Sequence, residues 1–213
     1  MHFFPRTKWG KVRFLIASAV LFSLFLYTWL MPLYGYLSYA PQEGDILFQS
    51  VYPTPLVRAI EGCTESPYSH CGVVVGKNGS WFVFEAGETV RKTPLFRWLR
   101  QGRGGRFDAY RLKKKYRKDI PGFTAALEKY EGRPYDIRYR MDDDHIYCSE
   151  LVYKAYKDAT GTGLGECKRL GELKWQAFED TIRSIEGRLP LDRVMITPRH
   201  LSEAEQIEMI FSN

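Results

Sequence analysis

An uncharged, strongly apolar run fills the N-terminal part of the chain, from Phe14 to Gln42. Its most apolar part, Phe14 to Leu33, is about as long as the ~20 residues that a helix needs to cross a bilayer. It also exceeds the roughly 7 to 15 residues of a signal-peptide core. The pattern therefore predicts a membrane-spanning helix. The alternative is a cleaved signal peptide, because Ser38-Tyr39-Ala40 resembles a cleavage site, although Pro41 directly after it would hinder cutting.

The charges on either side of this run are unequal. Arg6, Lys8, Lys11 and Arg13 precede it, and the next basic residue is Arg58. Because cytoplasmic flanks carry the excess of Lys and Arg, we expect a single-pass protein of the cytoplasmic (inner) membrane with its main domain on the periplasmic side. Removing these four basic residues leaves 27 basic against 25 acidic residues, so the net charge falls from +6 to +2. Overall basicity therefore says little about partners.

Two short apolar runs in the middle of the chain predict a β-hairpin. They are Ser69 to Gly76 and Trp81 to Ala86, and the turn between them has the glycines and the asparagine that positive φ angles require. In an antiparallel pair of this length, a residue near the start of the first strand faces one near the end of the second. The hairpin therefore predicts that His70 lies beside Glu85.

Helical spacing of apolar residues predicts a helix that begins near Cys148 and stops at Gly161. Residues 41–213 are enough for one domain with its own core, so we divide the chain into an anchor, 1–40, and a single domain, 41–213. Strands and helices are segregated, which predicts an α+β domain with a mainly antiparallel sheet. The further elements expected are a strand at Phe107–Leu112 and helices at Pro121–Tyr130, Lys174–Ile185 and Ser202–Ile210, the last with a Ser/Glu capping signal.

Cys148 stands at the predicted start of a helix, where a thiol becomes more reactive. The unpaired N–H groups of a first helical turn carry about half a positive charge, and they stabilise a thiolate whose free pKa is about 8.5. A buried core cysteine is the alternative for this residue alone. His70 and Glu85 favour the reactive thiol over the core cysteine. Thiol-dependent hydrolysis needs a nucleophile, a histidine base and a polar group that orients the histidine, and all three are present.

The order of these segments resembles the permuted papain-like amidases of the YiiX/YaeF type, within the wider NlpC/P60 superfamily. In the permuted branch the histidine precedes the cysteine. The resemblance implies a circularly permuted papain-like fold over residues 41–213, with Cys148 as nucleophile, His70 as base and Glu85 as orienting group. Residues 161–190 match no motif of the family. The segments that carry the resemblance are Gly44-Asp45-Ile46-Leu47-Phe48, Ser69-His70, Phe84-Glu85-Ala86, Gly132-Arg133-Pro134-Tyr135-Asp136, Tyr147-Cys148-Ser149-Glu150-Leu151-Val152 and Val194-Met195-Ile196-Thr197-Pro198.

The function expected from these residues is cleavage of an amide bond in the cell envelope by a membrane-anchored cysteine amidase or peptidase. Tyr135, Asp136 and Tyr147 are the residues that we expect to line the substrate pocket. The family resemblance suggests cell-wall peptides as substrates, whereas membrane proximity suggests lipid-linked amides or lipid acyl groups, which a thiol enzyme would hydrolyse or transfer. A binding module without catalytic activity on the same fold is the remaining alternative.

Other features of the sequence bear on partners and cofactors. Between Arg91 and Lys118 there are twelve Lys or Arg residues and one acid, a run that either is solvated or meets an anionic surface such as phospholipid headgroups. No nucleic-acid-binding motif is present. The run 142–145 (Asp-Asp-Asp-His) predicts a solvated loop rather than a metal site, and no cofactor is expected. Cys63 and Cys71 are close enough in sequence to form a disulfide, but the sequence does not require one.

Overall fold

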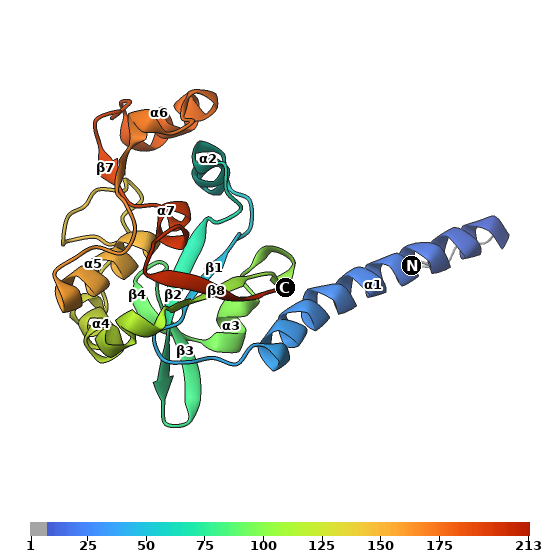
Figure 1. Ribbon diagram of the computed structural model, residues 1–213. Coiled ribbons are helices and arrows are strands. Elements are labelled where there is room, and N and C mark those ends of the chain that lie inside the picture. Colours follow the sequence, from blue (N-terminus) through green and yellow to red (C-terminus); the bar gives the residue numbers. More distant parts are fainter. Residues whose placement is uncertain (1–7) are drawn as a thin grey trace.

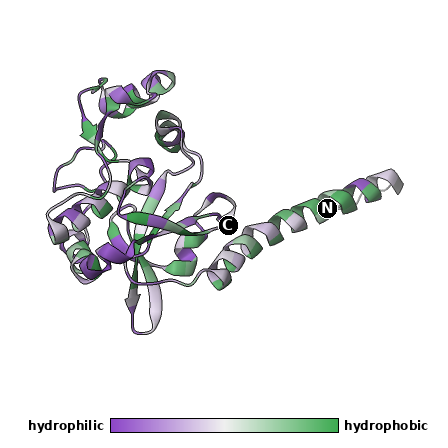
Figure 2. Ribbon diagram, viewed as in Figure 1, coloured by the Kyte–Doolittle hydropathy of each residue, from purple (hydrophilic) through white to green (hydrophobic). Residues whose placement is uncertain are grey.

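The computed structural model describes residues 8–213 of the chain. Helix α1, Lys8–Ser38, extends away from the rest of the molecule (Figure 1) and is apolar along most of its length (Figure 2). Its residues from Trp9 to Ser38 are long and apolar enough to cross a membrane, and no part of the most apolar window is buried. Arg6, in the basic flank, lies outside the described residues.

A six-stranded antiparallel sheet forms the centre of the domain, in the order β4-β3-β2-β1-β5-β8. The predicted hairpin is β2 (His70–Lys77) and β3 (Ser80–Ala86), joined by a turn in which Asn78 and Gly79 have φ angles of 52° and 75°. The small strands β6 and β7 pair separately. The remaining bounds are β1 Ile46–Gln49, β4 Val90–Pro94, β5 Asp108–Leu112, β6 Lys168–Arg169, β7 Val194–Met195 and β8 Ile207–Ser212.

Helices cover both faces of this sheet. On one face, α5 packs with α4 against Cys71, Val73 and Phe84 of the hairpin. On the other face, α3 contributes Trp98 and Leu99 to a second core that also contains Val74 and Val83. Figure 1 shows α2 and α6 beyond one end of the sheet. The helix bounds are α2 Pro55–Thr64, α3 Leu95–Leu99, α4 Ile120–Leu127, α5 Cys148–Thr160, α6 Glu179–Glu186 and α7 Pro198–Ser202.

The predicted α+β class and mainly antiparallel sheet are confirmed, but the prediction of a helix at Ser202–Ile210 is wrong. The chain forms the short helix α7, whose cap is Thr197, and then the edge strand β8. Strand β8 satisfies the open edge of β5 and brings Phe211 into the second core. A local Ser/Glu capping signal carries no information about an open sheet edge far away in the sequence, and pairing at that edge overrides it.

The other predicted elements agree more closely with the structure. The strand expected at Phe107–Leu112 is β5, and the helix expected at Pro121–Tyr130 is α4 followed by a 3₁₀ turn, Glu128–Tyr130. The helix expected from Lys174 begins later: a 3₁₀ turn, Gln176–Phe178, precedes α6.

Candidate active site

Cys148 is the first residue of α5, as the sequence predicts. The preceding residue, Tyr147, has extended backbone angles, and its N–H donates to the Glu150 carboxylate at 3.2 Å, which closes the start of the helix. The Cys148 side chain is fully buried, and its Sγ lies 4.0 Å from the backbone oxygen of Ser69. The thiol therefore lies at the positive end of a helix and next to the start of β2.

The hairpin brings His70 and Glu85 into direct contact. Their strands pair with Val73 opposite Phe84, so the two residues are diagonal neighbours on one face of the sheet. His70 Nε2 lies 2.6 Å from Glu85 Oε2. Gly72 lies opposite Glu85, and a Cβ there would be 2.5 Å from Val83 Cγ1 and 2.8 Å from the Phe84 backbone oxygen, so the close packing at this position requires glycine.

Glu85 is held by several partners at once. Its carboxylate is fully buried, its Oε1 accepts a hydrogen bond from the Thr93 hydroxyl at 2.6 Å, and Arg91 Nε lies 3.5 Å from the same oxygen. Burial alone would raise the pKa of Glu85, but the contact with His70 and the Thr93 and Arg91 interactions lower it to about 2. Glu85 is therefore a fixed carboxylate at any physiological pH.

His70 is held between this carboxylate and the thiol. Its ring stacks on the Trp98 indole, with centroids 5.8 Å apart and planes 28° apart. Burial lowers the pKa of His70, but its interactions with Cys148 and Glu85 outweigh burial and raise the pKa to about 10. Because Nε2 contacts Glu85, Nδ1 is the ring nitrogen left for the thiol.

The Cys148 thiol has a second neighbour that the sequence analysis did not select, Cys71. Hydrogen bonding from the Cys71 thiol, and then from His70, lowers the pKa of Cys148 well below its ordinary value in spite of burial. Burial and the same contact raise the pKa of Cys71, which keeps its proton and acts as a donor. All four cysteines are free thiols, so Cys63 and Cys71 do not form a disulfide. These shifts favour a Cys148 thiolate paired with a His70 imidazolium.

The three expected pocket residues have different surroundings. Tyr147 is fully buried; its hydroxyl accepts from the Ile196 N–H at 3.1 Å and donates to Met141 Sδ, so it packs inside the domain. The Asp136 carboxylate is also buried, and both of its oxygens accept backbone N–H groups of the following loop at 2.9 and 2.6 Å. Tyr135 is the one whose position suits a pocket.

Tyr135 and Tyr139 form a pair next to the thiol. Their hydroxyls are 3.0 Å apart, and the Tyr139 ring packs on Tyr147 with centroids 4.5 Å apart. Burial and the negative charge of Cys148 raise the pKa of Tyr135 well above its ordinary value, so its phenol keeps its proton. Tyr139 was not expected from the sequence; its position four residues after Tyr135, in the loop before α5, was the available signal.

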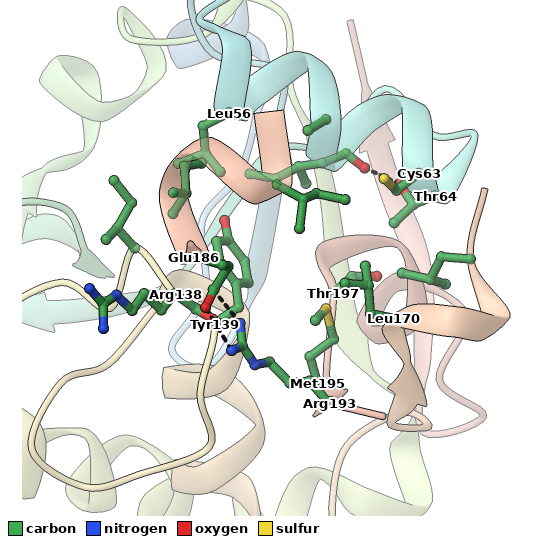
Figure 3. Close-up of a pocket in the computed structure, with 16 residues that line it drawn as sticks. Leu56, Cys63, Thr64, Arg138, Tyr139, Leu170, Glu186, Arg193, Met195 and Thr197 are labelled. Carbon is green, nitrogen blue, oxygen red and sulfur yellow. Dashed lines mark hydrogen bonds and ion pairs between the residues drawn. The ribbon is translucent and has the colours of Figure 1, made fainter. Parts of the chain in front are cut away.

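An apolar pocket of about 80 Å³ opens beside Tyr139. Leu56 and Ile60 of α2, Ile182 and Ile185 of α6 and Met195 of β7 contribute apolar side chains to its wall. In its wall the Arg193 guanidinium pairs with the Glu186 carboxylate, with Nη2 and Oε2 2.8 Å apart (Figure 3). The pocket is therefore small and mainly apolar, with one ion pair in its wall.

Comparison with known proteins shows the family of this chain. Residues 40–211 match the family described as permuted papain-like amidase enzymes, YaeF/YiiX, C92 family. The chain belongs to this family. The YaeF/YiiX relative in Escherichia coli K12, the uncharacterized protein YiiX, is 32% identical over 177 residues, which are 81% of this chain and 87% of YiiX. Membership supports a cysteine-type amidase or peptidase at the level of the family.

The YaeF/YiiX fold is also found in a crystal structure of yiiX from E. coli O157:H7, described as a metalloprotein. It has a TM-score of 0.77 and 30% sequence identity to this chain, and the match covers 82% of this chain and 99% of that one. Residues 8–213 of the present chain contain no group of three or more His, Cys, Asp or Glu side chains placed to hold a metal ion. Within the run 142–145, Asp143 pairs with Lys154 at 2.8 Å, and Asp142 accepts backbone N–H groups of its own loop. These residues do not fit a metal site.

Proposed function

We propose that this protein is a membrane-anchored cysteine amidase that cleaves an amide bond in the cell envelope. Cys148 is its nucleophile, His70 its base and Glu85 the group that orients His70. The observation that carries the proposal is the 2.6 Å contact between His70 Nε2 and Glu85 Oε2. His70 is the first residue of β2, and Ser69, just before it, lies against Cys148. Family membership supports the same reaction class.

The reaction follows from the charges of these groups. The Cys148 thiolate attacks the amide carbon, and the negative charge that develops on the carbonyl oxygen is stabilised by the unpaired N–H groups at the start of α5. The Tyr135 hydroxyl, which keeps its proton, is the candidate for a second donor to that oxygen. His70 gives its Nδ1 proton to the departing amine and then takes a proton from the water that hydrolyses the thioester.

The apolar pocket lined by Tyr139 does not include Cys148, His70 or Glu85 in its wall, so in this proposal it holds an apolar group of the substrate beyond the Tyr135–Tyr139 pair and not the bond that is cut. A pocket with this lining offers a polar peptide few hydrogen bonds, and its length suits a short part of an acyl chain. It therefore favours a lipid-linked amide over a polar cell-wall peptide. Hydrolysis or transfer of lipid acyl groups by the same thiol is the second candidate, favoured by the same pocket.

The proposed location rests on α1 and on the charges around it. The helix is long and apolar enough to span a membrane, and basic residues precede it. By the positive-inside rule, the domain lies on the periplasmic side of the inner membrane, where envelope amides are in reach.

A series of N-acyl amides with chains of two to eight carbons tests the proposed function. Full-length protein in maltoside micelles should cleave them with a kcat/KM that rises about fourfold per methylene until the pocket is full, since each buried methylene contributes roughly 0.8 kcal/mol. Ile182→Trp narrows the pocket and should abolish the rise, whereas Ile210→Trp, on the edge strand β8, should keep it. Equal rates for all chain lengths, or faster cleavage of a polar peptide amide, would contradict the proposed substrate. No cleavage of any amide by a folded protein would favour the binding module instead.

A further inference from the structure

The domain packs against the side of the C-terminal half of α1. The Arg100 guanidinium lies 3.8 Å from the centroid of the Trp29 ring, and the Tyr36 ring contacts Phe96 with centroids 5.5 Å apart. Gly105, at a φ of 69°, lies so close to α1 that a Cβ there would be 2.4 Å from the Pro32 ring. Residues 100–105 therefore pack beside the part of α1 that contains Trp29 and Pro32.

This contact determines how much of α1 is free to enter a membrane. Of the contacts that Tyr27, Trp29, Pro32 and Tyr36 make with the domain, that of Tyr27 is nearest the start of α1: its hydroxyl lies 3.4 Å from the position of a Cβ on Gly104. The stretch before it, residues 8–26, is roughly 28 Å long at 1.5 Å per residue, close to the ~30 Å of a hydrocarbon core. Its charged residues, Lys8, Lys11 and Arg13, all lie in its first two turns, where long basic side chains extend to the headgroups of the opposite leaflet. The span is thus shifted toward the N-terminus relative to the apolar run Phe14–Leu33, whose end is covered by the domain. Tyr and Trp are the residues that gather at the boundary between lipid tails and headgroups. Tyr27 and Trp29 therefore stand at headgroup level.

A cavity of about 480 Å³ opens at this level, between Tyr27 of α1 and the loop that carries Arg103 and Arg106. Its size lies in the range of ligand sites, about 300 to 1,000 Å³. Arg103 pairs with Glu61 at 3.1 Å, and within residues 8–213 Arg106 has no ion pair. Asp108 is the single acidic side chain in the wall as described, and it accepts a hydrogen bond from the Tyr68 hydroxyl; Asn213, with its main-chain carboxylate, also lines the wall. The side chains of the wall thus present one unpaired guanidinium group, that of Arg106, a second that shares its charge with Glu61, and one hydrogen-bonded carboxylate.

Polar groups of the cavity wall also connect it to the candidate active site. Gln49 lines the cavity, is buried, and has an Oε1 without a hydrogen-bond partner among the described residues. Its backbone oxygen accepts from the Ser69 N–H at 3.1 Å, and the Ser69 oxygen in turn is the atom 4.0 Å from Cys148 Sγ. Ser69 is therefore the one residue between Gln49 in the cavity wall and the Cys148 thiol. Gln49 Oε1 is an acceptor that a hydroxyl or ammonium group of a ligand would satisfy.

We propose that this cavity binds the phosphodiester headgroup of a phospholipid from the membrane that α1 enters. Arg103 and Arg106 bind the phosphate, because a guanidinium matches phosphate oxygens in charge and shape. Gln49 Oε1 accepts from a hydroxyl or ammonium group of the headgroup. The lipid tails then lie along the exposed apolar side chains of α1. The inference depends on the proposal that α1 is a membrane anchor.

Native mass spectrometry of the full chain, released from maltoside micelles, tests the site. With added dioleoyl phosphatidylglycerol, the parent protein should retain one lipid, and dioleoylglycerol, which lacks the phosphate, should not be retained. Arg106→Gln should weaken retention about fivefold, equivalent to about 1 kcal/mol for one basic group near phosphate. The matched control is Arg97→Gln, an exposed arginine of α3 outside the cavity wall, which should retain the lipid as the parent does. Both substitutions are on exposed side chains, so both variants should fold.

Equal retention by Arg106→Gln and the parent would overturn the proposal, as would an equal loss in Arg97→Gln, which would indicate surface charge alone. Saturation by inorganic phosphate without any retained phosphatidylglycerol would assign the cavity to a soluble anion and also overturn it. Failure of the membrane anchor is a separate result, because the protein would then be recovered in the soluble fraction of cells. Failure of the headgroup site leaves the protein in the membrane fraction.

Discussion

Replacing Glu85 by glutamine keeps the size of a fully buried side chain and removes the charge that faces His70. In the parent protein the pKa of Glu85 is lowered from 4.5 to about 2, and that of His70 is raised from 6.5 to about 10. Each change is a net effect, because His70 also interacts with Cys148, and Glu85 also interacts with Thr93 and Arg91 while burial opposes these interactions. The change on Glu85 is the one that belongs to the charge that the substitution removes. It corresponds to on the order of 3 kcal/mol at 1.36 kcal/mol per pKa unit.

A loss of that size predicts a fall of about 10² in the rate of acylation, within a range of about 10 to 10³. The charge on Glu85 holds the imidazolium that must be present when the thiolate attacks. Without it, the pKa of His70 falls and the pKa of Cys148 rises. Single-turnover acylation should therefore slow, and the pH at which iodoacetamide alkylates Cys148 at half its maximal rate should move upward.

Stability should change in a defined pH window. The lowered pKa of Glu85 stabilises the folded state above about pH 4.5, and this contribution is lost as the pH falls through about 2. The raised pKa of His70 stabilises the folded state below about pH 6.5, and this contribution is lost as the pH rises through about 10. The difference in melting temperature between the parent and Glu85→Gln should therefore be largest between about pH 4.5 and 6.5.

Asp136→Asn is the matched control, because Asp136 is also a buried carboxylate but its oxygens accept backbone N–H groups of its own loop. It should lower the melting temperature and leave the alkylation profile of Cys148 unchanged. A folded Glu85→Gln variant with the acylation rate and alkylation profile of the parent would refute the role of Glu85. A shifted profile in Asp136→Asn alone would transfer that role to Asp136.

Two further predictions concern the thiol and the membrane. Cys148→Ala should abolish labelling by a thiol-directed activity probe, whereas Cys63→Ala and Cys167→Ala should keep it; Cys71→Ala should keep the label but raise the pH at which labelling begins, because the thiolate loses a donor. Undiminished labelling of Cys148→Ala would identify another nucleophile. A reporter fused after Asn213 should be active only outside the cytoplasm, with the protein in the membrane fraction and its N-terminus retained; a soluble form beginning at Pro41 would indicate a signal peptide instead.

Much of the local structure could be predicted from the sequence alone. Alternating and continuous apolar runs predicted β2 and β3, because strand periodicity and turn glycines are local properties. The start of α5 at Cys148 and its end at Gly161, which has a φ of 80°, follow from equally local signals. The hairpin even predicts that His70 meets Glu85, because one short turn determines the register of the two strands.

Only the tertiary structure decided what surrounds these residues. Thr93, Trp98 and Cys71 support Glu85, His70 and Cys148, yet each contact depends on how α3, β4 and α5 pack on the sheet. The same holds for β8, where pairing with an open edge outweighed a helix-capping signal. Contacts between residues distant in the chain depend on the packing of whole elements, and local patterns carry no record of it.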